Sequence, residues 1–222
     1  MGRSLIGIIV SIIFVFLIIG ISTVLTNLKI ISGEWSRKFI HIAVCNWWIA
    51  AMYFFDSPLE ASIVPALFVF VNYISYKKQL FKAMERDGSK NDLGSVYYAI
   101  SLLILSILTF RDSSYAYVGG IGIFTLGYGD GFAAAVGSRY GKRRYKVGNV
   151  TKSVEGTLAM FIFSFLAIFI TLSIYNPNNT IVISLILALF ATLVEAITPF
   201  GLDNLTVPLL TPIVYLGLLK IF

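Results

Sequence analysis

The stretch LIGIIVSIIFVFLIIGISTVL, residues 5–25, contains no charged side chain. A helix needs about 20 consecutive apolar residues to cross the roughly 30 Å hydrocarbon core of a bilayer. The stretch is too long for the apolar part of a signal peptide, and no small-residue cleavage site follows it. We therefore expect residues 5–25 to form the first of several membrane-spanning helices.

The rest of the chain repeats this pattern. The 222 residues are 58% hydrophobic and only 13% charged, and the mean hydropathy is +0.87, which is atypical of soluble domains. The sequence predicts an all-α integral membrane protein of the cell membrane, a multi-pass bundle of seven or eight transmembrane helices in a single domain, 1–222. Pro208 and Pro212 interrupt the last run, so we expect it to be bent or only partly inserted. The further apolar runs are 39–55, 58–76, 95–110, 115–136, 154–175, 180–197 and 205–222.

The 17 Lys and Arg residues are distributed unevenly over the connecting segments. Most lie between the first two runs, at 77–92 or at 137–152, and the intervening loops hold only Arg111. Cytoplasmic loops of membrane proteins are enriched in Lys and Arg, so we predict that these three segments are cytoplasmic and that the N-terminus is outside. The net charge of +6 then reflects topology and not a nucleic-acid partner. The single cysteine, Cys45, excludes an intrachain disulfide.

Several acidic residues lie in or beside the apolar runs, toward the ends predicted to be cytoplasmic. An ionised side chain inside a bilayer costs about 2.5–3.5 kcal/mol on insertion scales, so such residues are candidates for a function. A structural ion pair with a loop Lys or Arg is the alternative for each. The basic residues Arg37 and Lys38 and the only histidine, His41, are expected at the same depth, and this convergence favours a site on the cytoplasmic face. The acids are Asp130, Glu155, Glu195 and Asp203.

The segment GYGDGFAAAVGSRYGK, residues 127–142, combines an acid with small residues at helical spacing. Asp130, Gly137 and Gly141 would share one helix face, where a ligand or another helix could approach closely. Close helix packing alone is the alternative. Because a basic cluster follows at 142–152, we favour a magnesium–nucleotide site, in which a carboxylate holds the metal and cations neutralise the phosphates.

Other phosphate and catalytic motifs do not fit. Residues 137–142 are one residue short of a P-loop, and Arg143 stands where that motif needs Ser or Thr. The beginning of the CDP-alcohol phosphatidyltransferase motif is present, but Ala135 replaces its arginine and no second acid occurs before Glu155. With one His and one Cys, neither a Cys/His metal cluster nor a Ser-His-Asp triad is expected.

Three ordered segments resemble the CTP-dependent lipid-alcohol kinases, a family of dolichol kinases, phytol and farnesol kinases and fungal-type diacylglycerol kinase. They are RKFIH at 37–41, GDGFAAAVGSRYGK at 129–142 followed by TKSVEG at 151–156, and EAITPFGLDNLTVP at 195–208. Together they cover the catalytic core of the family, about residues 33–210. The resemblance implies phosphorylation of the hydroxyl of a membrane-embedded isoprenoid alcohol, of polyprenol, dolichol, phytol or farnesol type. The phosphoryl donor would be CTP, the cofactor a divalent cation such as Mg²⁺, and the products the lipid monophosphate and CDP.

The resemblance also implies roles for individual residues. Asp130 and Asp203 would bind the metal, with Glu155 and Glu195 as further ligands or as partners of the ligands. Asp130 is the candidate general base and His41 the reserve, although loose phosphoryl transfer needs little from a base. The nucleotide-binding set would be Arg37, Lys38, Gly137, Gly141, Lys142, Lys152 and Ser153.

Three alternative functions stay open at this point. The first is a CTP-dependent diacylglycerol kinase, and the second is a cytidylyltransferase that activates a lipid phosphate with CTP. The third is a non-catalytic carrier of lipids or ions. The oligomeric state does not follow from the sequence.

Overall fold

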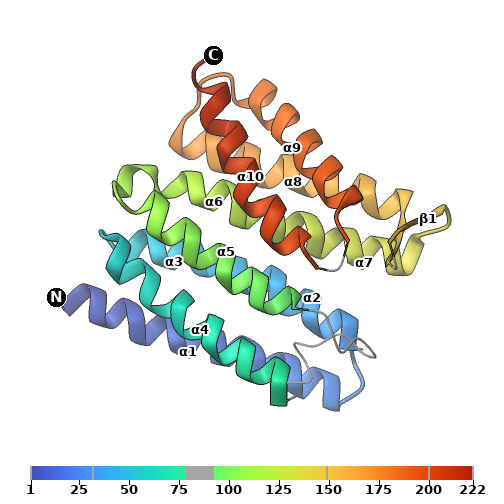
Figure 1. Ribbon diagram of the computed structural model, residues 1–222, viewed down its shortest axis with the longest axis horizontal. Coiled ribbons are helices and arrows are strands. Elements are labelled where there is room, and N and C mark those ends of the chain that lie inside the picture. Colours follow the sequence, from blue (N-terminus) through green and yellow to red (C-terminus); the bar gives the residue numbers. More distant parts are fainter. Residues whose placement is uncertain (1, 32, 79–92, 149, 200, 222) are drawn as a thin grey trace. The chain divides into compact units, whose positions relative to one another are not determined.

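The structure is a computed structural model that describes residues 2–31, 33–78, 93–148, 150–199 and 201–221. The chain divides into two compact units, Met1–Ala116 (unit 1) and Tyr117–Phe222 (unit 2). Each unit is built mainly of α-helices packed side by side (Figure 1). This confirms the predicted helical fold class. That residues 1–222 act as a single domain stays a prediction.

Unit 1 contains five α-helices among its described residues. α1 packs against α2, α3 and α4, and α4 packs along α5. Large aromatic rings fill the interior. Trp48 donates its indole N–H to the Ala116 carbonyl at 2.9 Å and meets Phe110 edge to face. The elements are α1 (Gly2–Asn27), α2 (Gly33–Cys45), α3 (Trp47–Phe54), α4 (Pro58–Lys78), α5 (Gly94–Thr109) and the short 3₁₀ helix η2 (Ser113–Tyr115).

The apolar run at 39–55 is not one helix. It is divided between α2 and α3 at Asn46, whose side-chain amide donates to the carbonyls of Ile42 at 2.9 Å and Ala43 at 3.3 Å. A short polar side chain that bonds the preceding backbone competes with the helical ladder. The asparagine inside this apolar run was the signal for the interruption.

Unit 2 begins with three helical elements that follow one another directly: α6 (Ala116–Phe124, whose first residue belongs to unit 1), the π-helix η3 (Thr125–Asp130) and α7 (Gly131–Tyr140). A β-hairpin then leads into α8 (Val154–Tyr175), α9 (Thr180–Ile197) and α10 (Asp203–Leu218). α8 packs against α7, η3 and α9, and α10 packs against α9 and η3. The bounds predicted for α8 and α9 are confirmed, because polar turns delimit both apolar runs.

The hairpin was not predicted, since the sequence indicated only a basic connecting segment at 137–152 in an all-α protein. β1 (Arg144–Val147) pairs antiparallel with β2 (Val150–Ser153), with Lys146 opposite Thr151. Gly148, in the turn, has a φ of 57°, a left-handed conformation that glycine adopts without strain. The signal available was a Gly-Asn pair between two short stretches that contain β-branched residues.

Among the residues that the structure describes, four helices, α1, α4, α8 and α9, are long and apolar enough to cross a membrane, and α5 is a shorter apolar helix. Large apolar side chains project outward from them, such as Leu5, Phe70 and Ile170, which are 60%, 64% and 57% exposed. A helical bundle with an apolar outer surface is the form that lipid solvates well. The protein is therefore a helical membrane protein. The predicted seven or eight crossings and the orientation stay predictions.

One packing contact in unit 2 depends on a glycine. A Cβ on Gly122 of α6 would clash with the Pro208 carbonyl and lie 2.9 Å from Cγ of Pro212, both on α10. Pro212 has no N–H to donate to the Pro208 carbonyl four residues earlier, and α6 covers that carbonyl closely.

We expect Gly122→Ala to lower the free energy of unfolding by about 1–3 kcal/mol, because backbone and proline ring atoms cannot move aside cheaply. The control is Gly217→Ala on α10, where an added Cβ has no atom within 4 Å. Thermal unfolding of both variants in detergent is the measurement. Equal midpoints would contradict the tight approach of α6 to α10.

Candidate active site

Three carboxylates from different elements of unit 2 meet at one place. One oxygen from each of Asp130, Glu195 and Asp203 lies within 4.8 Å of the other two. Asp130 is the last residue of η3, Glu195 lies near the end of α9, and Asp203 is the first residue of α10. Asp130 and Glu195 are 4% and 5% exposed, so the carboxylate cluster is largely shielded from solvent.

The π-helix positions Asp130. η3 has a wider turn than an α-helix, and such turns occur frequently at functional sites. The neighbouring Gly129 leaves no room for a side chain, because a Cβ there would lie 2.7 Å from the Met160 sulfur and against the Ser164 hydroxyl of α8. The backbone therefore approaches α8 closely just before the carboxylate.

The hairpin brings a cation to the carboxylate cluster. Lys152, on β2, extends its ammonium group to 2.7 Å from Oε1 of Glu195. The same Nζ donates to the carbonyls of Glu195 and of Thr198, the second at 3.3 Å. These carbonyls lie at the C-terminal end of α9, where a positive charge is favourable. Lys152 thus joins the hairpin, the end of α9 and the carboxylate cluster.

A tight turn presents Asp203. Gly201 has a φ of 75°, which a residue with a Cβ rarely adopts. Asn204 donates its backbone N–H to Oδ1 of Asp203 at 3.0 Å, and its side-chain amide donates to the Gly201 carbonyl at 3.0 Å. Asn204 is 2% exposed. It orients the carboxylate and holds the turn, a role that the sequence interpretation did not assign to it.

Glu155 is not among the acids that meet. Its carboxylate accepts hydrogen bonds from the backbone N–H groups of Lys142 at 3.1 Å and Arg143 at 3.3 Å. It therefore holds the beginning of the hairpin segment to the first turn of α8. The predicted metal role of Glu155 stays a prediction. These hydrogen bonds favour the second role predicted for it, as a partner of the metal ligands and not as a ligand itself.

The predicted phosphate-binding residues of unit 2 lie beside α8. Ser153 caps this helix, its Oγ accepting the Gly156 N–H at 3.1 Å. A Cβ on Gly137 would lie 2.9 Å from that same Oγ, and one on Gly141 2.7 Å from it. The glycines therefore allow α7 and its end to approach the start of α8, as the packing alternative expected. The Lys142 side chain is exposed to solvent. Nucleotide contacts of these four residues and of Lys152 stay predictions.

The remaining predicted residues belong to α2 of unit 1, where all three are buried. Arg37, Lys38 and His41 are 6%, 7% and 2% exposed. The His41 ring stacks on Tyr98 of α5, with 4.6 Å between centroids, and its Nδ1 lies 3.1 Å from the Arg37 carbonyl. Because a carbonyl only accepts, Nδ1 carries the proton there in the neutral ring. The structure brings these residues together within unit 1, and their roles toward nucleotide stay predictions.

The carboxylate cluster suits a divalent cation. Mg²⁺ prefers carboxylate oxygens, and the three groups are close enough to share one cation after small side-chain adjustments. Carboxylates brought this close raise one another's free energy when ionised, and a cation between them relieves that repulsion. The donor set therefore fits a divalent cation, and the roles of Asp130, Glu195 and Asp203 as its ligands stay predictions.

Comparisons with known proteins point to one group of enzymes. The chain is 31% identical to a phytol kinase of Synechocystis over 194 residues, which is 83% of this chain and 79% of the relative. It is 31% identical to a probable chloroplastic phytol kinase of Triticum aestivum, over 86% of this chain and 69% of the relative. A dolichol kinase of Schizosaccharomyces pombe is 31% identical over 99 residues, 44% of this chain and 19% of the relative.

No family model matches the chain, and no solved structure matches it significantly. The phytol kinase similarity nevertheless extends over most of both proteins at an identity above 30%. The chain belongs to the family of lipid-alcohol kinases that includes the phytol kinases and dolichol kinases.

Proposed function

We propose that the protein transfers the terminal phosphoryl group of CTP to the hydroxyl of an isoprenoid alcohol dissolved in the membrane. The products are the lipid monophosphate and CDP. The observation that carries the proposal is the buried cluster of Asp130, Glu195 and Asp203, with Lys152 bonded to it. In a chain related to phytol kinases, a carboxylate cluster of this kind supports metal-assisted phosphoryl transfer.

A metal ion, a base and Lys152 would each have one role in the phosphoryl transfer. When bound, a divalent cation such as Mg²⁺ supplies positive charge for the triphosphate oxygens. The alcohol oxygen forms the new bond to phosphorus, the bond from phosphorus to the bridging oxygen of CDP breaks, and CDP leaves. The hydroxyl proton passes to a base, for which the Asp130 carboxylate is our candidate and the His41 imidazole the reserve. Lys152 holds Glu195 in place and offsets part of the negative charge of the cluster.

The proposal assigns phosphate binding to residues of the first two of the three sequence motifs. We assign it to Arg37 and Lys38 of α2 and to the segment 137–153, which holds Gly137, Gly141, Lys142, Lys152 and Ser153. We also place the protein in the cell membrane as a multi-pass protein. The plant relatives are named chloroplastic, so the membrane in which this chain resides is part of the proposal.

The test is product analysis with purified full-length protein in detergent. Each of the four nucleoside triphosphates is supplied with Mg²⁺ and with phytol, farnesol, a polyprenol or diacylglycerol. We expect CTP and an isoprenoid alcohol to give the lipid monophosphate and CDP, and EDTA to stop the reaction. The Asp130→Asn variant, prepared identically, controls for a contaminating kinase.

Other products would contradict the proposal in distinct ways. Turnover of diacylglycerol alone would indicate a diacylglycerol kinase. A CDP-lipid and pyrophosphate, formed from a lipid phosphate, would indicate a cytidylyltransferase. No product with any combination would favour a carrier.

A further inference from the structure

A pocket lies within unit 1. Its empty space, including the part that is open to solvent, is about 590 Å³, and α1 to α5 all contribute to its wall. Most of the lining is apolar, including Val44, Val64, Phe68 and Leu102.

The polar lining residues gather at one end. Asn72 of α4 donates its side-chain amide to the Ser95 carbonyl at the start of α5, at 3.0 Å. One turn further along α5, Tyr98 stacks on His41 and donates its hydroxyl to the His41 carbonyl at 3.3 Å. These contacts place Asn72, Ser95, Tyr98 and His41 within about one helical turn of one another, and Arg37 lies one turn before His41 on α2.

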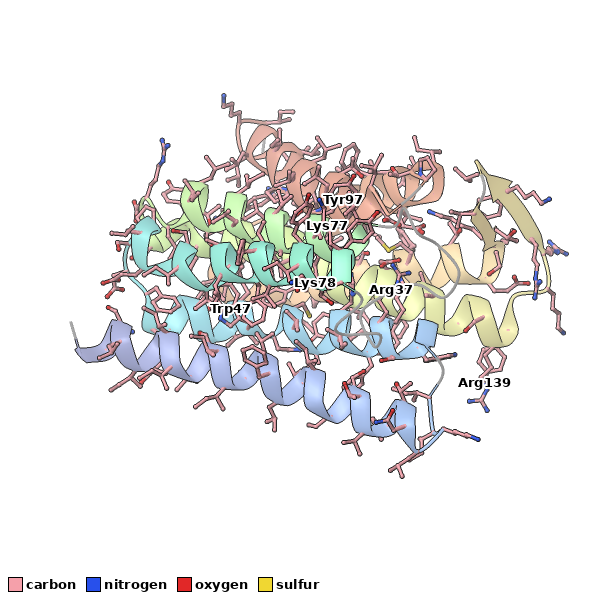
Figure 2. All side chains as sticks on the ribbon, turned by 60° about the horizontal axis from the view of Figure 1, so that its bottom comes forward. Arg37, Trp47, Lys77, Lys78, Tyr97 and Arg139 are labelled. Carbon is pink, nitrogen blue, oxygen red and sulfur yellow. The ribbon has the colours of Figure 1, made fainter. Side chains whose placement is uncertain are left out.

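The other end of the pocket is mainly apolar, although the indole N–H of Trp47 there has no hydrogen-bond partner among the described residues. Trp47 lies six residues beyond His41, and Figure 2 shows it well separated from Arg37 along α2 and α3. On α4, Val64 and Phe68 precede Asn72 by two turns and one turn, and on α5, Leu102 follows Tyr98 by one turn. Asn72 is six residues from Lys78 at the end of α4, which is about 9 Å of helix. The polar end therefore lies near the basic end of α4, and the apolar end extends away from it.

Asn72 carries an acceptor that suits a hydroxyl. The residue is 7% exposed, and among the described residues no donor reaches its Oδ1. The orientation of the amide follows from its contact, because the Ser95 carbonyl can only accept and therefore faces the NH₂ group. A buried carbonyl oxygen that accepts no hydrogen bond is unfavourable. A ligand O–H at the polar end of the pocket would donate the missing hydrogen bond to Oδ1 of Asn72.

We propose that this pocket binds the acceptor lipid, with its hydroxyl donating to Oδ1 of Asn72 and its hydrocarbon chain lying along Phe68 and Leu102. That the ligand is a lipid alcohol rests on the proposed function. This assignment adds a binding site in unit 1 and makes Asn72 a residue that recognises a neutral headgroup. A phosphorylated lipid would offer acceptors where Asn72 requires a donor, so the contact with Asn72 is specific for the unphosphorylated hydroxyl.

The experiment is photolabelling of the full-length protein in detergent by an isoprenoid alcohol that carries a diazirine in its chain. We expect the label on peptides of α2, α4 and α5 that line the pocket. Phe68→Trp should fill the pocket and reduce labelling roughly tenfold, equivalent to about 1.4 kcal/mol of binding. Phe70→Trp, on the same helix but 64% exposed, is the matched control and should label like the wild type.

Asn72→Leu tests the hydroxyl contact. It should reduce labelling by the alcohol probe while leaving labelling by an analogue without the hydroxyl unchanged. A thermal unfolding scan of each variant verifies that the reduced labelling does not result from unfolding. If Asn72→Leu proves unstable, Phe68→Trp still tests the pocket, because it leaves the amide contact of Asn72 intact. Labelling elsewhere, wild-type labelling of Phe68→Trp, or stronger competition by the lipid phosphate than by the alcohol would overturn the assignment.

The product analysis separates this inference from the proposed function. If the protein phosphorylates an isoprenoid alcohol but the label lies outside the pocket, only the pocket assignment is wrong. If the pocket is labelled as expected but no alcohol is phosphorylated, the kinase proposal is wrong and the pocket stands as a site for a neutral lipid alcohol.

Discussion

Asp130→Asn should reduce turnover by roughly a hundredfold or more, equivalent to at least about 2.7 kcal/mol of transition-state stabilisation, while the protein stays folded. Asparagine keeps the size of the side chain at this 4% exposed position but removes the charge that a metal ligand needs. The measurement is the rate of lipid monophosphate formation, matched for folded protein. Because the position is also packed, thermal unfolding in detergent is measured alongside.

The control for this variant is Asp112→Asn. Asp112 is exposed and its carboxylate accepts from the Ser114 N–H at the beginning of η2, so its loss should leave turnover near that of the wild type. A second readout does not depend on activity: Mg²⁺ should raise the unfolding midpoint of the wild type and raise it less for Asp130→Asn. Retention of more than about a tenth of the turnover, a loss below about 1.4 kcal/mol, would remove Asp130 from the metal site.

Lys152→Met should both destabilise unit 2 and abolish most turnover. The Lys152 and Glu195 side chains are 12% and 7% exposed and their charged atoms lie 2.7 Å apart. Removing one partner of a buried ion pair typically costs about 3–5 kcal/mol, because the other charge stays in a poorly solvating environment. Lys146→Met, an exposed position on the neighbouring strand β1, is the matched control and should change neither property.

The double variant Lys152→Met with Glu195→Gln distinguishes a structural pair from a catalytic one. Removing both charges should restore much of the stability that the single change loses. Turnover should stay low if Glu195 binds the metal. Recovery of both stability and turnover would show that the pair serves the fold alone, and would reduce the site to Asp130 and Asp203.

Much of the fold could be predicted because hydropathy is a local property. Each run of about 20 apolar residues indicates a helix without knowledge of its neighbours, and the bounds of α8 and α9 are confirmed to the residue. Local signals were weaker where the backbone departs from a plain helix. The π-helix of η3 depends on how α8 and α10 pack around residues 125–130, and composition does not predict it.

The candidate site shows the same division. The sequence alone determined that this is an apolar helical protein with rare acids near helix ends, and that its motifs resemble those of lipid-alcohol kinases. Only the tertiary structure decided that Asp130, Glu195 and Asp203 meet and that Glu155 instead binds the backbone at residues 142–143. It also gave Lys152 its partner and placed Asn72 in a pocket. The reason is physical: the distance between groups on separate helices depends on how those helices pack, and one sequence carries no direct record of that packing.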